Sequence, residues 1–349
     1  MLQHIPSKPT TVLHAASASS AITHKPRIVG HRGALYQELE NTIPAFLACA
    51  GDCDAIELDV FVLPKDNTLV VFHGSGTDQN PGLLEDYCIY APHGAKSILD
   101  LTYEETQLLQ FNTKFAELAA PPERILEAKV PTLENVLQAI KPTGMEVKIE
   151  LKGLGTAQPT VELVDRLGMR DQVSYSSFNH KEIEMVRKLR PQMNPDGTYV
   201  YRTGALFDDV PDDFIQRALT VGASEIHLKY DECTTERIAA IHGAGMSSMA
   251  WFRGPIGMKS DTTSKYWDIG NEDESCYQTL METGVQQLCV NKPDVLAGLL
   301  RRLEMEEQHQ QQQQQAIGPT PFAQSILPSE LGQLALEQPP AGMGQGVSA

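Results

Sequence analysis

Short apolar runs alternate with amphipathic segments through most of the chain. Eight of the runs have the length of buried strands, and they cover residues 27–31, 55–60, 145–151, 172–177, 198–207, 224–230, 247–252 and 286–291. Helical stretches follow most of them, such as residues 132–140, in which Thr132 can cap a helix with one apolar face. This alternation predicts an α/β fold, the (β/α)8 TIM barrel, with a doubly wound open sheet as the alternative.

One segment interrupts the alternation. In residues 58–73, LDVFVLPKDNTLVVFH, only a Pro-Lys-Asp-Asn turn separates two strand-like runs. Parallel strands need a longer crossover, so we expect an antiparallel hairpin that returns His73 to the vicinity of Glu57 and Asp59. Residues 74–131 then form an insertion above that end of the barrel, and residues 253–274 form a second insertion.

The two ends of the chain have compositions typical of disordered segments. Residues 1–25 lack apolar periodicity and residues 303–349 are rich in Gln, Pro and Gly, so we expect one folded domain at residues 26–302. The acid-free N-terminal segment faintly resembles an organelle transit peptide, although simple disorder is the favoured interpretation. Six cysteines without a CxxC pair, and the lack of a signal-peptide core, favour reduced thiols and a cytoplasmic protein.

The overall charge and hydropathy exclude some classes of partner. The formal net charge is −17 at pH 7, and such a surface repels nucleic acid and anionic lipid at long range. No apolar run is long enough to span a bilayer, so we expect no transmembrane segment. A small-molecule substrate is the expected partner, and the composition predicts no particular oligomeric state.

Three carboxylates are expected at the carboxyl ends of neighbouring strands, where barrels carry their active sites. Glu57 and Asp59 are two residues apart in one run and so share a face, and Glu150 lies near the end of the next parallel run. Carboxylates that converge there repel one another unless a cation lies between them. Because every ligand atom would be oxygen, the pattern predicts a site for a divalent metal, Mg²⁺ or Ca²⁺.

Basic side chains gather at the same end of the predicted barrel. His31 and Arg32 come at the end of the first strand, and Lys152 follows Glu150 by two residues. Arg32 and Lys152 can bind a phosphate group, whereas His31 and His73 titrate near neutral pH, as a general acid and base require. Beside a metal site, these side chains favour phosphoryl chemistry.

Glu40, His227 and Trp251 are further candidates for the pocket. Glu40 either pairs with the arginine eight residues earlier or complements the N-terminus of the next helix. Asn41 or Thr42 is the N-cap of that helix, and capping suffices to explain Asn41. For His227, packing or support of the site is favoured over direct lining of the pocket. Trp251 either stacks over a choline-like cation or forms an aromatic part of the rim.

The motifs and their order resemble those of the glycerophosphodiester phosphodiesterase family. GHRG, ENT, IELDV, VVFH, VPTLENVL, IELKG and GVQQLCVNKPD follow the family order over roughly residues 27–302. The resemblance implies a TIM barrel that hydrolyses glycerophosphodiesters, such as glycerophosphocholine, to sn-glycerol 3-phosphate and an alcohol. It also implies metal ligation by Glu57, Asp59 and Glu150, with acid and base roles for His31 and His73.

Two departures from the family pattern leave alternatives open. Gly74 follows His73 where the family usually has Asp, so either Asp78 supplies the missing carboxylate or Gly74 makes room for a larger leaving group. Residues 291–294 read Asn-Lys-Pro-Asp where the family has Thr-Asp-x-Pro. The alternative functions are a lysophospholipase D-type hydrolase acting on lysophospholipids, and a catalytically impaired barrel that only binds its ligand.

Overall fold

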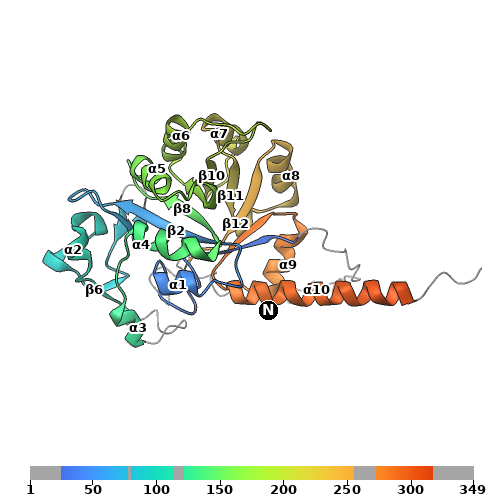
Figure 1. The fold of residues 1–349 in the computed structure, drawn as a ribbon, viewed down its shortest axis with the longest axis horizontal. Helices are drawn as coiled ribbons and strands as arrows, with labels where there is room; N and C mark the ends of the chain where they lie inside the picture. The colour runs from blue at the N-terminus through green and yellow to red at the C-terminus, as the bar shows by residue number, and fades with distance from the viewer. Residues whose placement is uncertain (1–24, 78–79, 114–121, 255–271, 317–349) are drawn as a thin grey trace, which may run out of the picture. The chain divides into compact units, whose positions relative to one another are not determined.

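The computed structural model describes residues 25–77, 80–113, 122–254 and 272–316 (Figure 1). The chain divides into two units, residues 1–302 and 303–349, and the first contains every described strand. Most of the N-terminal segment predicted to be disordered, Asp78 and most of the second predicted insertion lie outside the described residues. Among the helices that the structure describes, none is long and apolar enough to cross a membrane.

Eight parallel strands form a closed barrel, which confirms the predicted fold. They are β1 (Arg27–Gly30), β2 (Ala55–Val62), β8 (Glu146–Leu151), β9 (Val173–Ser177), β10 (Arg202–Phe207), β11 (Glu225–Lys229), β12 (Ser247–Trp251) and β13 (Gln287–Val290). Each pairs with its neighbour in this order, and β1 pairs with both β2 and β13. The pairing of β1 with β13 closes the sheet and excludes the doubly wound alternative.

Helices surround the barrel and bury its outer face (Figure 1). They are α1 (Ile43–Leu47), α4 (Leu133–Ile140), α5 (Ala157–Arg166), α6 (His180–Leu189), α7 (Phe214–Thr220), α8 (Thr235–Gly243), α9 (Glu274–Glu282) and α10 (Pro293–Ala316). The predicted N-cap Thr132 accepts a hydrogen bond from the backbone of Asn135 at 3.1 Å. Apolar side chains of α4 and α5 pack with those of β2 and β8 in one buried cluster, which fixes these two strands side by side.

The predicted hairpin is confirmed, and its second strand pairs with β2. Strand β3 (Leu69–Val71) runs antiparallel to β2 with Val60 opposite Val71, and the backbone of Phe72 donates to the carbonyl of Asp59 at 3.0 Å. His73 therefore returns beside Asp59. The predicted insertion that follows contains β4 (Ser75–Thr77), β5 (Asn80–Leu83), β6 (Cys88–Tyr90), β7 (Gln110–Phe111), α2 (Tyr103–Thr106) and α3 (Pro122–Glu127).

A buried polar cluster fills part of the barrel interior. Lys148 is 1% exposed, and its Nζ lies 3.1 Å from Glu225 and 3.3 Å from Glu146. Glu225 also pairs with His227 at 3.0 Å and accepts from Gln287 at 3.0 Å. Burial lowers the pKa of His227. Burial would raise the pKa of Glu225, but Lys148 and His227 hold it well below its usual value.

Two predicted boundaries were wrong. The strand predicted at residues 198–207 begins only at Arg202, because the backbone of Asn194 bonds Thr198 and turns the preceding residues back on themselves. The tail predicted to be disordered from residue 303 is helical as far as Ala316, where α10 ends. Residues 303–316 contain good helix formers and neither Pro nor Gly, so low complexity did not distinguish an exposed helix from disorder.

Candidate active site

The three predicted metal ligands meet at the carboxyl end of the barrel. Strands β2 and β8 are adjacent, with Asp59 opposite Glu150, and Glu57 projects from β2 on the same face as Asp59. One carboxylate oxygen from each of the three side chains lies within 4.8 Å of the other two. All three side chains are buried, which is an unfavourable environment for like charges unless cations compensate them.

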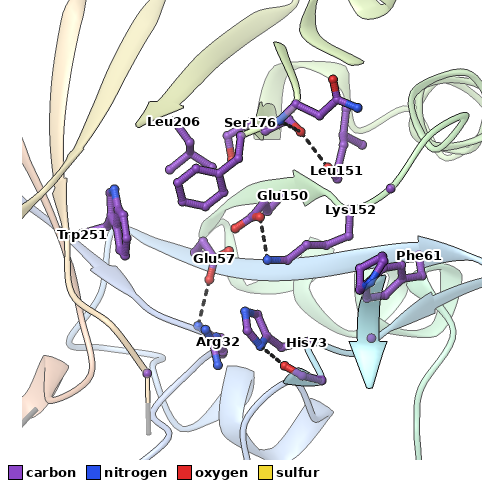
Figure 2. Close-up of a pocket in the computed structure, with 18 of the residues that line it drawn as sticks. Arg32, Glu57, Phe61, His73, Glu150, Leu151, Lys152, Ser176, Leu206 and Trp251 are labelled. Atoms are coloured by element: carbon purple, nitrogen blue, oxygen red, sulfur yellow. Dashed lines mark hydrogen bonds and ion pairs between the residues drawn. The ribbon is translucent and has the colours of Figure 1, made fainter. Parts of the chain in front are cut away.

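Two basic side chains supply part of this compensation. Lys152 Nζ lies 2.7 Å from Glu150 (Figure 2). It also lies 3.3 Å from Asp59, and Arg32 Nε lies 3.4 Å from Asp59. The backbone N–H of Arg32 also donates to Glu57 at 3.1 Å. Burial would lower the pKa of Lys152, but the two carboxylates beside it raise the value instead.

The pKa values of the three carboxyl groups indicate that Arg32 and Lys152 do not fully compensate their negative charge. Burial and the neighbouring carboxylates raise the pKa of Glu57 well above its usual value, and burial also raises the pKa of Glu150. Burial would raise the pKa of Asp59 too, yet Lys152 and other nearby cations lower it. Three buried carboxylates, two of them with raised pKa values, fit a hard divalent cation such as Mg²⁺ or Ca²⁺.

Both predicted histidines face this group of carboxylates. His31 Nε2 lies 3.9 Å from Glu57, while its Nδ1 lies 2.8 Å from Asn291 Oδ1. His73 Nδ1 contacts the carbonyl of Gly74 and lies 3.3 Å from the Tyr87 hydroxyl. Burial, with the nearby Arg32 charge, lowers the pKa of His31 to about 3 and that of His73 well below its usual value. Both imidazoles are therefore neutral near pH 7 in the free protein.

Glu40 and Asn41 orient two charged side chains of the site, Arg32 and Asp59. Glu40 takes the first of its two predicted roles, because its carboxylate lies 3.0 Å from Arg32 NH1. The explanation of Asn41 as a helix cap was wrong, since Thr42 caps α1. Asn41 instead donates to Asp59 Oδ2 at 2.8 Å and accepts from the Asp59 backbone at 3.2 Å. The first bond orients the Asp59 carboxylate, and the second ties Asn41 to strand β2.

A cavity of about 340 Å³ opens above these groups. Its polar wall includes His31, Arg32, Glu57, His73, Glu150 and Lys152, and its apolar walls include Phe61, Leu154, Phe178, Leu206, Met249 and Trp251. Trp251 packs edge-on against Phe178 with ring centroids 5.5 Å apart. Of the pocket candidates, Trp251 thus lines the cavity. His227 lies instead in the buried polar cluster, outside the described lining.

Space beside Gly74 is already filled. Gly74 has φ +67°, and a Cβ atom added there would lie 2.7 Å from the backbone of Gly82 in β5. The idea that Gly74 makes room for a larger leaving group therefore has no support at this position. Asp78, the other suggested replacement for the missing carboxylate, lies outside the described residues.

Three residues of the site had no role in the sequence analysis. Tyr87, from the insertion, accepts from Arg32 NH1 at 3.4 Å and lies beside His73. Asn291 was noted only as a departure from a family motif, and Glu272, which bonds it, follows no motif. The unusual residue at position 291 was the one available signal, whereas the contacts of Tyr87 and Glu272 depend on tertiary structure.

Comparisons with known proteins agree with this geometry. The model of the Glycerophosphoryl diester phosphodiesterase family matches residues 31–295. A glycerophosphodiester phosphodiesterase from Caldanaerobacter subterraneus subsp. tengcongensis is 25% identical over 284 residues, which cover 80% of this chain and 99% of the relative.

Two solved structures share the fold. A phosphodiesterase from Oleispira antarctica, in complex with the product sn-glycerol-3-phosphate, superposes with a TM-score of 0.60 at 20% identity, covering 79% of this chain and 97% of that one. A glycerophosphodiester phosphodiesterase from Parabacteroides distasonis gives 0.57 at 19% identity, covering 81% and 99%. The matched family region contains every motif residue of the site, and the chain belongs to the glycerophosphoryl diester phosphodiesterase family.

Proposed function

We propose that the protein is a metal-dependent hydrolase that cleaves glycerophosphodiesters, such as glycerophosphocholine, to sn-glycerol 3-phosphate and an alcohol. The observation that carries the proposal is the carboxylate triad at a cavity that is lined by two of its members, Glu57 and Glu150, together with two histidines and two cations. Membership of the family supports the reaction class. The product named in the Oleispira antarctica structure supports sn-glycerol 3-phosphate as the phosphate-containing product of this reaction.

Each charged side chain has a task in this reaction. Arg32 and Lys152 line the cavity and attract the phosphodiester anion. Glu57, Asp59 and Glu150 would hold Mg²⁺ or Ca²⁺, which when bound supplies Lewis-acid stabilisation of the phosphoryl charge. Asn41 holds the Asp59 carboxylate and the Asp59 backbone through one hydrogen bond each, which orients this ligand.

The two histidines would move the protons. One would take the proton of the attacking hydroxyl, from water or from the neighbouring glycerol hydroxyl. The other would have to enter the reaction as an imidazolium, give its Nε2 proton to the leaving alcohol and regain a proton from solvent afterwards. In both His31 and His73 the Nδ1 atom is engaged with a protein oxygen, which leaves Nε2 for the substrate. The geometry is compatible with either assignment of acid and base.

A lysophospholipid is a second candidate substrate. The apolar walls of the cavity favour it, and Leu154 at the wall is 74% exposed, as a contact for an acyl chain would be. Lysophosphatidylcholine and glycerophosphocholine share the choline leaving group, so choline release from the two compares them directly.

The test measures choline release from both substrates with Mg²⁺ or Ca²⁺ and after addition of EDTA. Glu150→Gln removes a charged ligand and should lower the rate by about 10²-fold or more while the protein stays folded. Glu162→Gln makes the same change at an exposed position on α5 and should have no effect. Activity that persists in EDTA, or a lack of hydrolysis of any glycerophosphodiester, contradicts the proposal.

A further inference from the structure

Three buried side chains form a line that leads from the cavity into the protein behind His31. His31 Nδ1 lies 2.8 Å from Asn291 Oδ1, and Asn291 Nδ2 donates to Glu272 Oε2 at 2.6 Å. The side chains are 7%, 0% and 1% exposed, so water does not compete for these bonds. We infer that Asn291 and Glu272 are positioning residues that determine which ring nitrogen of His31 carries the proton. The inference rests on the proposed function of His31 in proton transfer.

The orientation of the Asn291 amide follows from its surroundings. Its Nδ2 has two acceptors, Glu272 Oε2 and the carbonyl of Arg253 at 2.8 Å. A reversed amide would place Oδ1 against both acceptors, with no hydrogen between them. The Oδ1 atom therefore faces His31, and only a protonated Nδ1 can donate to it. Because a neutral imidazole has one ring proton, Nε2 keeps its lone pair on the cavity side.

Glu272 is held just as firmly as the amide that it orients. Its Oε1 accepts from the backbone N–H of Asn291 at 2.7 Å, from that of Lys292 at 3.2 Å and from the Tyr277 hydroxyl at 2.7 Å. Burial raises the pKa of Glu272, and these donors oppose that rise. Both carboxylate oxygens of Glu272 accept hydrogen bonds, and these bonds fix the orientation of the carboxylate.

This arrangement has a direct chemical consequence. A histidine that is fixed in one tautomer presents the same ring nitrogen to every substrate molecule, whereas a mobile imidazole loses part of its population to the wrong form. Asn291 occupies the first position of the motif in which the chain departs from its family. In this chain the Asn291 oxygen is the acceptor for the imidazole, and Glu272 is the group that keeps that oxygen in place.

Nitrogen NMR of the uniformly ¹⁵N-labelled full-length protein reads the tautomer without any assay of activity. Long-range ¹⁵N–¹H correlation spectra distinguish a protonated ring nitrogen from one with a lone pair, and His31→Gln identifies the His31 signals by their loss. We expect a protonated Nδ1 and an unprotonated Nε2 in the unmodified protein. A proton on Nε2 there would overturn the inference before any positioning residue is changed.

Substitution of Glu272 should populate the other tautomer of His31. In Glu272→Gln, the side-chain amide would meet Asn291 Nδ2 donor to donor, and only the Arg253 carbonyl would still hold the Asn291 amide in its original orientation. A turned amide, with Nδ2 facing His31 Nδ1, then becomes populated, and in that form the imidazole proton lies on Nε2. Tyr277→Phe is the matched control, because it removes one donor from Glu272 and leaves the Asn291 amide unchanged; we expect the original tautomer in this variant.

The kinetic readout follows the spectra. Glu272→Gln should lower kcat by about tenfold with KM little changed, since the substrate is still bound but much of the His31 population is in the wrong form. Tyr277→Phe should keep kcat within about threefold. An unchanged tautomer together with an unchanged kcat in Glu272→Gln would refute the inference. If no diester is hydrolysed at all, the proposed function fails, while the spectra still decide the roles of Glu272 and Asn291.

Discussion

Replacement of Gly74 by alanine measures how closely the insertion packs on the segment that carries His73. The new Cβ would lie 2.7 Å from both Cα and the carbonyl carbon of Gly82, which are backbone atoms and cannot rotate away. The left-handed backbone at φ +67° costs about 1–2 kcal/mol for a residue with a Cβ, and the overlap adds about 1–3 kcal/mol. We expect Gly74→Ala to lower the free energy of unfolding by about 2–5 kcal/mol.

Gly144→Ala is the matched control for this change. Gly144 has φ +76°, and a Cβ there would meet no described atom within 4 Å, so its substitution carries only the backbone cost of about 1–2 kcal/mol. Both substitutions restrict the unfolded chain equally, so that effect cancels in the comparison. Urea unfolding followed by circular dichroism gives both free energies. Equal losses in the two variants would show that β5 does not press on Gly74 and that the position has room for a side chain.

Three further results are expected. Tyr87→Phe removes the hydroxyl beside His73 and Arg32 and should lower kcat by about tenfold; full activity would show that Gly74 alone orients the histidine. Truncation after Arg302 removes the second unit and should leave the melting temperature and rate unchanged, whereas a lower melting temperature would mean that this unit supports the barrel. Burial lowers the pKa of His227, so below its ordinary value of 6.5 the unfolded chain binds a proton that the folded protein does not, and stability falls as the pH falls. His227→Gln should therefore lose less stability than the unmodified protein between about pH 7.5 and about pH 5.5 in urea titrations, and equal losses would contradict this.

The sequence predicted the barrel and the carboxylate triad because both depend on local spacing. Glu57 and Asp59 share a face through the two-residue period of a strand, and the short turn after Val62 left a hairpin as the only way to place His73. The two-residue period of a strand and the minimum length of a parallel crossover hold in every fold, so both can be used from the sequence alone. Strand boundaries were less accurate, as at Arg202, because turn hydrogen bonds decided where pairing began.

Contacts between side chains that lie far apart in the sequence could not be predicted. For His227 the favoured interpretation, packing or support of the site, agrees with its pairing to Glu225, but the partners of Glu225 across the barrel, Lys148 and Gln287, could not be predicted. Asparagine is common at helix N-caps, and only the structure shows that the Asn41 side chain donates to Asp59 instead. Tyr87 lies in an insertion whose course has no periodic signal.

The β2–β3 hairpin limits which changes of length the chain can tolerate. One strand, β2, carries two carboxylates of the triad, and its partner leads directly into His73 through the bond between Phe72 and Asp59. Loss or gain of one residue in the turn at residues 63–68 would exchange the two faces of β3, because neighbouring residues on a strand point in opposite directions. The imidazole would then turn outward and Phe72 inward. The turn at residues 63–68 can therefore change length only by an even number of residues if His73 is to keep facing the carboxylates.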